Sequence, residues 1–281
     1  MKQFILRNGI SIPSIGFGTW KIPDGEASAK AVQEAISVGY RHLDLGAIYG
    51  NETGVGLGIR ASGLDREQLF VTDKLWNSDR GYNRTIEAFQ KSLDLLKLDF
   101  LDMYLMHWPA SPALYENWQD INLDTWRAFE YLYKQGYVKA IGVCNFFPHH
   151  LEALINDAAE TPMVDQIEYH PGQTQHETVD FCKLHNIQVE AWSPLGSGKM
   201  LKKDCLKNVA AQYGVSVARL CIKWCLQNGI IPLPKSVTLE RICENYNVFD
   251  FVIAEDDMNV LNNLPYIGGS GLNPDEITLF G

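Results

Sequence analysis

Short hydrophobic runs alternate with longer amphipathic segments along most of the chain. The runs have the length of β-strands and are rich in Val, Ile, Leu and Phe; they occupy residues 15–18, 41–45, 69–73, 101–106, 138–143, 164–169, 187–191 and 230–233. The longer segments have helical periodicity and occupy residues 26–38, 82–97, 124–135, 148–158, 176–185, 216–227 and 238–247. Residues 2–15 differ, because two short runs flank Asn8-Gly9, a dipeptide typical of a hairpin turn.

This alternation predicts one α/β domain over residues 1–281. Alternating strands and helices indicate a parallel sheet, either open and doubly wound or closed into a barrel. The strand count favours closure, so we expect a (β/α)8 TIM barrel with an N-terminal β-hairpin. No linker rich in Gly, Ser or Pro suggests a second domain. The tail after Pro265 has several glycines and no helical period, which predicts a loop that crosses the mouth of the barrel.

Polar or aromatic residues stand where most of the hydrophobic runs stop. They are Asp44, Lys74, His107, Asn145, Trp192 with Ser193, and Lys235; Gln166 lies within the sixth run. In a parallel barrel the carboxyl ends of all strands meet at one rim, and that rim holds the active site. A convergent set of this kind therefore predicts a functional site and not isolated core residues.

Four ionisable residues near this rim make a chemical mechanism when they are taken together. An ammonium group at Lys74 favours the phenolate of Tyr49, so we expect it to lower the pKa of this phenol and make it a usable acid. Asp44 would hold Lys74 charged, and His107 would hydrogen-bond a substrate oxygen. An Asp–Lys pair alone is more often a structural ion pair, but all four residues suit proton donation to a carbonyl oxygen.

Composition narrows the possible partners. The chain is 46% hydrophobic and 21% charged, as in a folded globular protein, and its net charge of −10 argues against nucleic acid or an anionic membrane. No stretch is long and apolar enough to span a membrane, and no clean signal peptide begins the chain, so we expect a cytoplasmic protein. The six cysteines form no CxxC pair; we expect buried free thiols and no metal site.

The glycine-rich stretches contain no competing nucleotide fingerprint. Gly16-Phe-Gly18 has Lys21 where a third glycine is required, and the glycines of 54–58 lie in a predicted helix. The segment Gly196-Ser-Gly198-Lys199 lacks the first glycine of a phosphate loop and has Met200 where Ser or Thr would bind magnesium.

One stretch, Gly39-Tyr-Arg-His-Leu-Asp44-Leu-Gly-Ala-Ile-Tyr49-Gly-Asn-Glu52, resembles the signature of the aldo-keto reductases. Further motifs follow in the family's order, namely Thr72-Asp-Lys74-Leu-Trp76, Leu105-Met-His107-Trp108-Pro, Gly142-Val-Cys-Asn145-Phe, Gln166-Ile-Glu-Tyr-His170-Pro, Ala191-Trp-Ser193-Pro-Leu-Gly and Pro234-Lys235-Ser236-Val237. The resemblance implies a barrel that uses NADPH, with Tyr49 as the acid, Lys74 and Asp44 tuning it, and His107 orienting the carbonyl. It is similar to short bacterial members that reduce diketogluconate or methylglyoxal.

The resemblance also implies a set of residues that bind NADPH. Asn145 and Gln166 would hold the nicotinamide carboxamide, and Trp192 would stack on the ring. Lys235, Ser236, Thr238 and Arg241 would surround the 2′-phosphate that NADH lacks, which predicts NADPH over NADH. The full set is Thr19, Asp44, Asn145, Gln166, Trp192, Ser193, Leu195, Lys235, Ser236, Val237, Thr238, Arg241, Glu244 and Asn245, and residues 196–198 would fold over the pyrophosphate.

The expected substrate is a small or aromatic aldehyde or ketone, because aromatic residues recur near the strand ends. The predicted substrate residues are Trp20, Tyr49, Trp76, His107 and Trp108. The chain departs from the family pattern at several positions. Leu45 and Gly46 stand where the family commonly has Thr-Ala, Asp73, Cys144 and Asp165 replace other residue types, and the tail lacks an arginine found in many relatives. Cys144 replaces a serine, and its thiol is a poor hydrogen-bond donor, which could weaken cofactor binding.

Three functions remain open at this point. The first is an NADPH-dependent carbonyl reductase, which we expect to be a monomer. The second is a redox-sensing subunit that binds NADPH, turns over slowly and regulates a partner. The third is a structural barrel without chemistry, against which the four intact catalytic residues argue.

Overall fold

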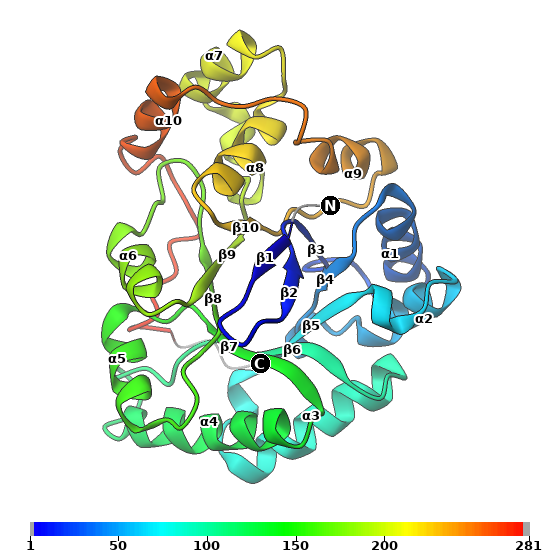
Figure 1. The fold of residues 1–281 in the computed structure, drawn as a ribbon, viewed down its shortest axis with the longest axis vertical. Helices are drawn as coiled ribbons and strands as arrows, with labels where there is room; N and C mark the ends of the chain where they lie inside the picture. Colours follow the sequence, from blue (N-terminus) through cyan, green and yellow to red (C-terminus); the bar gives the residue numbers. More distant parts are fainter. Residues whose placement is uncertain (1–2, 278–281) are drawn as a thin grey trace.

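Eight parallel strands form the centre of the molecule in this computed structural model, which describes residues 3–277 (Figure 1). They are β3 (Gly16–Gly18), β4 (His42–Asp44), β5 (Phe70–Leu75), β6 (Leu101–Met106), β7 (Val138–Cys144), β8 (Val164–Glu168), β9 (Gln188–Trp192) and β10 (Ile231–Pro232). They pair in sequence order, and Gly18 N donates to Pro234 O at 3.0 Å, which brings the last segment against the first. All eight predicted strands are confirmed, and the fold is a (β/α)8 TIM barrel.

The strands are buried on both faces, which explains why their sequences read as hydrophobic runs and do not alternate. Every residue of β5, β6 and β8 is buried. Helices cover the outer face, and side chains fill the interior, as expected for a parallel sheet in a closed barrel. The polar residues that end these strands are therefore held by a rigid core.

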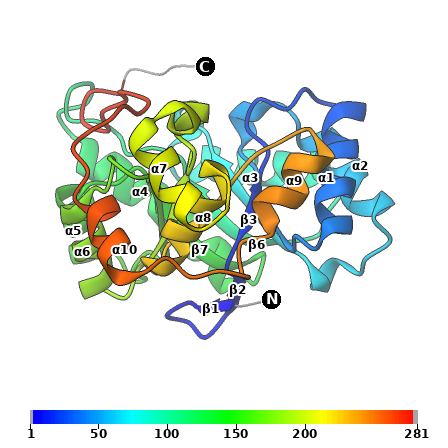
Figure 2. The ribbon, with the colours of Figure 1, turned by 90° about the horizontal axis from the view of Figure 1, so that it is seen from above.

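The predicted N-terminal hairpin consists of β1 (Gln3–Ile5) and β2 (Ser11–Pro13), which pair antiparallel. Its turn contains Gly9 at a φ of 85°, a conformation that glycine adopts without strain, and Asn8 Oδ1 accepts a hydrogen bond from Ile10 N. Figure 2 shows the hairpin at one edge of the barrel and the red C-terminal tail at the opposite edge. The hairpin therefore lies far from the rim that the tail covers.

Eight helices follow the strands at or near the predicted positions. They are α1 (Glu26–Val38), α2 (Glu52–Ala61), α3 (Tyr82–Leu96), α4 (Trp118–Lys134), α5 (Pro148–Asp157), α6 (His176–Leu184), α8 (Val217–Gln227) and α9 (Leu239–Tyr246). Helix α4 begins six residues before the predicted segment 124–135.

Two further helices, α7 (Asp204–Gln212) and α10 (Glu255–Asn262), were not predicted. Both are short, and α10 buries only Leu261, whereas α7 buries Leu206, Val209 and Ala210 on one face. Within residues 3–277 no helix is long and apolar enough to cross a bilayer.

The six cysteines are all free thiols, as predicted. Four of them are buried, but Cys205 and Cys243 are exposed, so the expectation of buried thiols was wrong for these two. Both belong to surface helices, α7 and α9, whose solvent face is polar.

The glycines of α2 permit close contacts between helices instead of binding phosphate. A Cβ at Gly56 would lie 2.2 Å from the carbonyl oxygen of Leu96, and one at Gly58 would lie 2.6 Å from that of Ala29. Gly54 is equally crowded, because a Cβ there would lie 2.6 Å from the backbone of Gly25. Only glycine allows α2 to approach its neighbours this closely.

Replacing Gly56 by alanine tests this packing, because the free energy of unfolding should fall if the contact is tight and rise if the helix is open. In an open helix the substitution would stabilise by about 1 kcal/mol, because alanine has the higher helix propensity. Here we expect the free energy of unfolding to fall by about 1–3 kcal/mol, as in other overpacked cores. Urea denaturation measures the change. Leu57→Ala, at an exposed position of the same helix, is the control, and a Gly56→Ala protein more stable than the parent would contradict the contact.

Candidate active site

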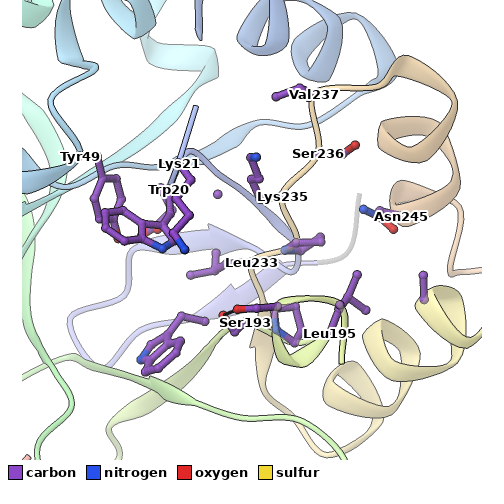
Figure 3. A pocket seen from close by; sticks show the side chains of 18 of the residues that line it. Trp20, Lys21, Tyr49, Ser193, Leu195, Leu233, Lys235, Ser236, Val237 and Asn245 are labelled. Carbon is purple, nitrogen blue, oxygen red and sulfur yellow. Dashed lines mark hydrogen bonds between the residues drawn. The ribbon is translucent and has the colours of Figure 1, made fainter. Parts of the chain in front are cut away.

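A cavity of about 840 Å³ opens at the carboxyl ends of the barrel strands. It extends from Trp20 and Tyr49 at one end to Ser236 and Asn245 at the other (Figure 3). Its walls come from the strand ends, from the loops that follow them and from the C-terminal tail. A cavity of this size accommodates a small-molecule ligand, and it lies at the rim where barrel enzymes place their chemistry.

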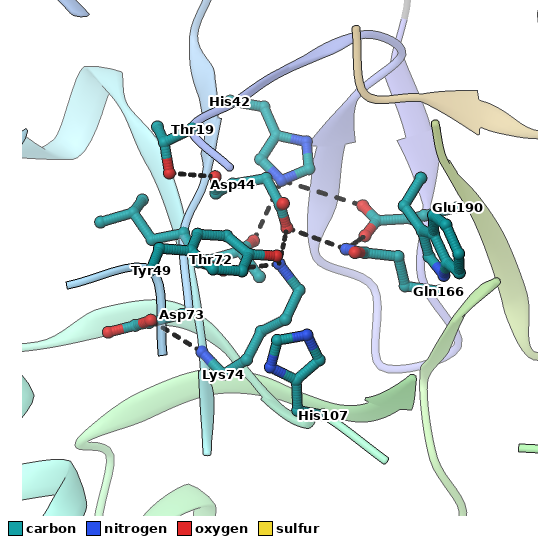
Figure 4. A network of polar contacts seen from close by, with 12 residues as sticks. Thr19, His42, Asp44, Tyr49, Thr72, Asp73, Lys74, His107, Gln166 and Glu190 are labelled. Carbon is teal, nitrogen blue, oxygen red and sulfur yellow. Dashed lines mark hydrogen bonds and ion pairs between the residues drawn. The ribbon is translucent and has the colours of Figure 1, made fainter. Parts of the chain in front are cut away.

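The four predicted catalytic residues come together at one end of this cavity (Figure 4). Asp44 ends β4, Tyr49 ends a short 3₁₀ helix after it, and His107 follows β6. Lys74, from β5, is only 1% exposed and lies behind the other three. Because β4, β5 and β6 are neighbours in the sheet, their carboxyl ends hold these side chains at short range.

Lys74 uses all three hydrogens of its ammonium group. Its Nζ donates to Asp44 Oδ1 at 2.6 Å, to the carbonyl oxygen of Leu45 at 2.5 Å and to Tyr49 Oη at 3.3 Å. The phenol oxygen of Tyr49 is thus an acceptor in this network. Tyr49 donates its own hydrogen to no residue in the described range 3–277, so this hydrogen is free for a molecule in the cavity.

Burial controls the protonation of this cluster. It raises the pKa of Tyr49 above the ordinary value, and the Lys74 charge only partly opposes this effect. Our expectation of a lowered pKa was therefore wrong in sign for the free protein, because desolvation outweighs the attraction. For Lys74 itself burial lowers the pKa, but Asp44 and then Tyr49 raise it above its usual value overall. At neutral pH the site thus contains a protonated phenol beside an ammonium group.

His107 is neutral for a related reason. Its side chain is buried, which lowers its pKa far below the ordinary value, and the Lys74 charge lowers it further. Its ring meets those of Tyr49 and Trp76 edge to face, with centroids 5.7 and 5.2 Å apart. His107 therefore presents a fixed imidazole, and not an imidazolium, to the cavity.

Aromatic residues form the wall of the cavity around Tyr49. Trp20, Trp76 and Trp108, all predicted to bind substrate, line it, and the ring of Trp20 lies 4.8 Å from that of Tyr49. Trp20 is 47% exposed, whereas Trp76 and Trp108 are buried. This end of the cavity is an aromatic mouth with one exposed ring, that of Trp20, at its edge.

All but one of the predicted cofactor residues line the cavity. These are Asp44, Asn145, Gln166, Trp192, Ser193, Leu195, Lys235, Ser236, Val237, Thr238, Arg241, Glu244 and Asn245. The structure does not place Thr19 with them: it is fully buried, and its Oγ1 donates to the carbonyl oxygen of Asp44 at 2.9 Å. The side chain bonds the backbone turn after β4, and a cofactor contact of Thr19 stays a prediction.

The middle of the cavity offers donors and acceptors suited to a carboxamide. Asn145 Nδ2 donates to the carbonyl oxygen of His107 at 3.0 Å, which leaves one amide hydrogen, and its Oδ1 accepts from Trp192 Nε1 at 2.7 Å. Asn145 adopts a φ of 62°, which turns its side chain toward these partners. The hydrogen bond that Trp192 donates to Asn145 also orients the indole. The ring face predicted to stack on the coenzyme is therefore held in place.

The far end of the cavity is positively charged. Lys235 and Arg241 line it, and neither has an acidic partner within ion-pair distance among residues 3–277. Burial and the nearby Lys21 lower the pKa of Lys235, as expected for cations held together. Thr238 precedes α9, and its N–H donates to Ser236 Oγ at 3.1 Å. Such a cluster suits a phosphate group.

Comparison with known proteins agrees with this arrangement. The Aldo/keto reductase family profile matches residues 14–264. The chain belongs to the aldo/keto reductase family. The glyoxal reductase of Bacillus subtilis is 47% identical to it over 97% of this chain and 96% of its own length. The methylglyoxal reductase DkgA of Salmonella typhimurium is 41% identical, with 96% of each chain covered. A crystal structure of a Gox0644 mutant in complex with NADPH is 38% identical, with a TM-score of 0.91 and 99% of each chain covered.

Among the departures from the usual aldo/keto reductase pattern, Asp73 and Asp165 point away from the cavity. Asp73 is buried near Glu52, and burial together with the Glu52 charge raises the pKa of Asp73. Asp165 faces the outer layer, toward Phe146 N and Cys182. Cys144 is buried and does not line the cavity.

The C-terminal tail of this reductase forms part of the substrate end, and our sequence reasoning missed the residues that hold it there. Leu272 lines the cavity, and Ile277 packs in a cluster with Trp76 and Trp108. Glu168 accepts hydrogen bonds from the N–H and the hydroxyl of Ser270, at 2.7 and 2.6 Å. The loop predicted from its glycines is thus fastened to the end of β8.

Asp275 provides a second anchor, between two histidines of α5. Its Oδ1 lies 2.8 Å from His149 Nε2 and 3.1 Å from His150 Nε2, and Ser111 Oγ donates to its carbonyl oxygen. His150 Nδ1 accepts from Phe147 N, and burial, with His149, lowers the pKa of His150 to about 3. A neutral ring that accepts at Nδ1 carries its proton at Nε2. That nitrogen has no lone pair for a metal ion. The anchor is therefore the hydrogen bond between His149 and Asp275, with His150 Nε2 as a close neighbour.

Asp275→Ala tests this anchor. The tail loses the charged acceptor that bonds His149, so we expect amide exchange of residues 264–277 to become about tenfold faster, which corresponds to one charge-assisted hydrogen bond. Hydrogen–deuterium exchange with mass spectrometry measures it. Asp204→Ala removes an exposed acid that pairs only with Lys207 and is the matched control. Unchanged exchange in the tail of Asp275→Ala would contradict the role of the anchor.

Proposed function

We propose that this chain reduces aldehydes and ketones to alcohols, with NADPH as the hydride donor and Tyr49 as the proton donor. The observation that supports the proposal best is that all three hydrogens of the Lys74 ammonium group are hydrogen-bonded, and the third binds the phenol oxygen of Tyr49. This bond directs the hydroxyl hydrogen of Tyr49 away from Lys74 and leaves it for a ligand. It also stabilises the phenolate that remains after proton transfer.

The residues of the cavity fit the coenzyme along its whole length. The remaining amide hydrogen of Asn145 can bind the carboxamide oxygen, and Trp192 can stack on the nicotinamide. Lys235 and Arg241, with no acidic partners among residues 3–277, suit the dianionic 2′-phosphate of NADPH. The coenzyme supplies a hydride to the carbonyl carbon. Tyr49 supplies the proton to the carbonyl oxygen, and the products are an alcohol and NADP⁺.

His107 orients the carbonyl group in this proposal. Its Nδ1 is buried and has no partner in the described chain. An unpaired buried N–H is rarer than an unpaired acceptor, so we assign the proton to Nε2. A neutral imidazole with this proton donates a hydrogen bond to the carbonyl oxygen without competing with Tyr49 as an acid.

The substrate that we propose is a small aldehyde, ketone or dicarbonyl. The rings of Trp20, Trp76 and Trp108 line the mouth, and relatives over almost the full chain are named for the reduction of glyoxal and methylglyoxal.

Tyr49→Phe tests the assigned acid. We expect the rate of NADPH oxidation with methylglyoxal or 4-nitrobenzaldehyde to fall by about 10²–10⁴-fold, because the phenyl ring keeps the packing and removes the proton. NADPH affinity, measured by tryptophan fluorescence, should change by less than about twofold. Tyr131→Phe, at an exposed position on α4, is the control. Equal rates in wild type and Tyr49→Phe would refute the proposal for Tyr49, and no turnover in wild type would refute the reductase.

Arg241→Ala tests the coenzyme preference. Loss of a charge-assisted bond to the 2′-phosphate should raise the KM for NADPH about 10- to 100-fold. The KM for NADH should stay nearly constant, because NADH has no group for Arg241 to bind. Steady-state kinetics with both coenzymes separate these effects. Arg127→Ala on the exposed face of α4 is the control, and an equal loss with both coenzymes would show that Arg241 does not read the phosphate.

A further inference from the structure

A second buried acid, Glu190, lies beneath Asp44 and has no part in the mechanism proposed above. It belongs to β9, and its side chain is fully buried. In the sheet it lies opposite Gln166 of β8 on one side and Ile231 of β10 on the other. Figure 4 shows Glu190 and Gln166 on the side of Asp44 away from Tyr49.

One amide group connects the two acids. Gln166 Nε2 donates to Asp44 Oδ1 at 2.8 Å and to Glu190 Oε2 at 2.9 Å, so both of its hydrogens are in use. Asp44 pairs with Lys74 and is a carboxylate, so only the NH₂ group of Gln166 can face it. The orientation of this amide is therefore fixed, and its Oε1 is left for the cavity, which Gln166 lines.

The surroundings of Glu190 favour its protonated form. The charged and titratable groups near it are Asp44 and His42 from β4, Lys74 from β5 and Cys144 from β7. Burial, and then the Asp44 charge, raise the pKa of Glu190 to about 8. Burial lowers the pKa of His42 to about 3, so this ring, 3.8 Å from Glu190, carries no charge to compensate an ionised acid.

We propose that Glu190 is a positioning residue, which holds the Gln166 amide so that Oε1 faces the nicotinamide carboxamide. In its protonated form Glu190 also leaves Asp44 as the one charged acid on this side of the nicotinamide ring. This inference rests on the coenzyme site proposed above. Oxidation gives the nicotinamide a positive charge, so a second carboxylate beneath it would favour NADP⁺ over NADPH. A neutral Glu190 removes this bias and favours binding of the reduced coenzyme.

Coenzyme binding between pH 6 and 9.5 tests the proposal without turnover. All variants carry Tyr49→Phe, which removes the titration of the phenol, and fluorescence titration gives the Kd of NADPH and of NADP⁺. With Glu190 present, we expect the ratio of the two affinities to shift toward NADP⁺ by about three- to tenfold above pH 8. Glu190→Gln should bind NADPH normally at pH 7 and abolish this shift. Glu190→Leu should weaken both coenzymes about tenfold, because Gln166 loses an acceptor.

Asp165→Asn is the matched control. Asp165 is also buried on β8 with a raised pKa, from burial, but it faces Phe146 and Cys182. It should retain the pH-dependent shift. A Glu190→Gln protein with the same shift as its parent would overturn the proposal, as would a folded Glu190→Leu protein with unchanged affinities. Failure of every variant, the parent included, to bind NADPH would instead refute the proposed coenzyme.

Thermal melting of the coenzyme-free protein provides a second readout. An acid whose pKa is raised by folding stabilises the native state fully below its unfolded value, near 4.5, and this stabilisation is lost as the pH rises toward about 8. Glu190→Gln does not titrate, so its Tm relative to wild type should increase from pH 5 to pH 8.5. A difference that does not change with pH would show that Glu190 is ionised throughout and would overturn the proposal.

Discussion

The active site depends on a buried ammonium group whose hydrogens are all paired. A cation in a protein interior is tolerated only when charge and hydrogen bonds replace its hydration. Lys74 satisfies this requirement with Asp44, the carbonyl of Leu45 and the oxygen of Tyr49. Because the first two partners are fixed by β4, the third bond fixes the phenol. The direction of the Tyr49 hydroxyl thus follows from the need to satisfy a buried charge.

The surroundings of this ion pair are kept neutral by desolvation. His42 and His107 are buried and unprotonated, and Glu190 retains its proton at neutral pH. A further charge here would change the balance between Lys74 and Asp44 without any change in their contacts. The barrel interior therefore limits the site to one ion pair, Lys74 with Asp44. The neutral residues around it are of types that are charged, or readily charged, in water.

The residues that contact substrate and the residues that transfer the proton come partly from different segments of the chain. The catalytic residues stand on strands of the rigid barrel, whereas one wall of the mouth comes from the tail. Two acid-centred anchors, Glu168 with Ser270 and Asp275 with the histidines of α5, hold this wall. The residues that hold this wall are therefore separate from those that hold the proton donor.

The amino-acid sequence by itself determined the eight strands, the hairpin and the polar residues of the rim, because strand burial and strand ends leave local patterns. Only tertiary structure decided which of these side chains touch. It buried Thr19 under a turn, brought Glu190 beneath Asp44 and placed Asp275 beside α5, although these partners are far apart in the chain. It also decided the direction in which the pKa of Tyr49 changes. Desolvation depends on how many atoms exclude water around the phenol, and these atoms come from distant parts of the sequence.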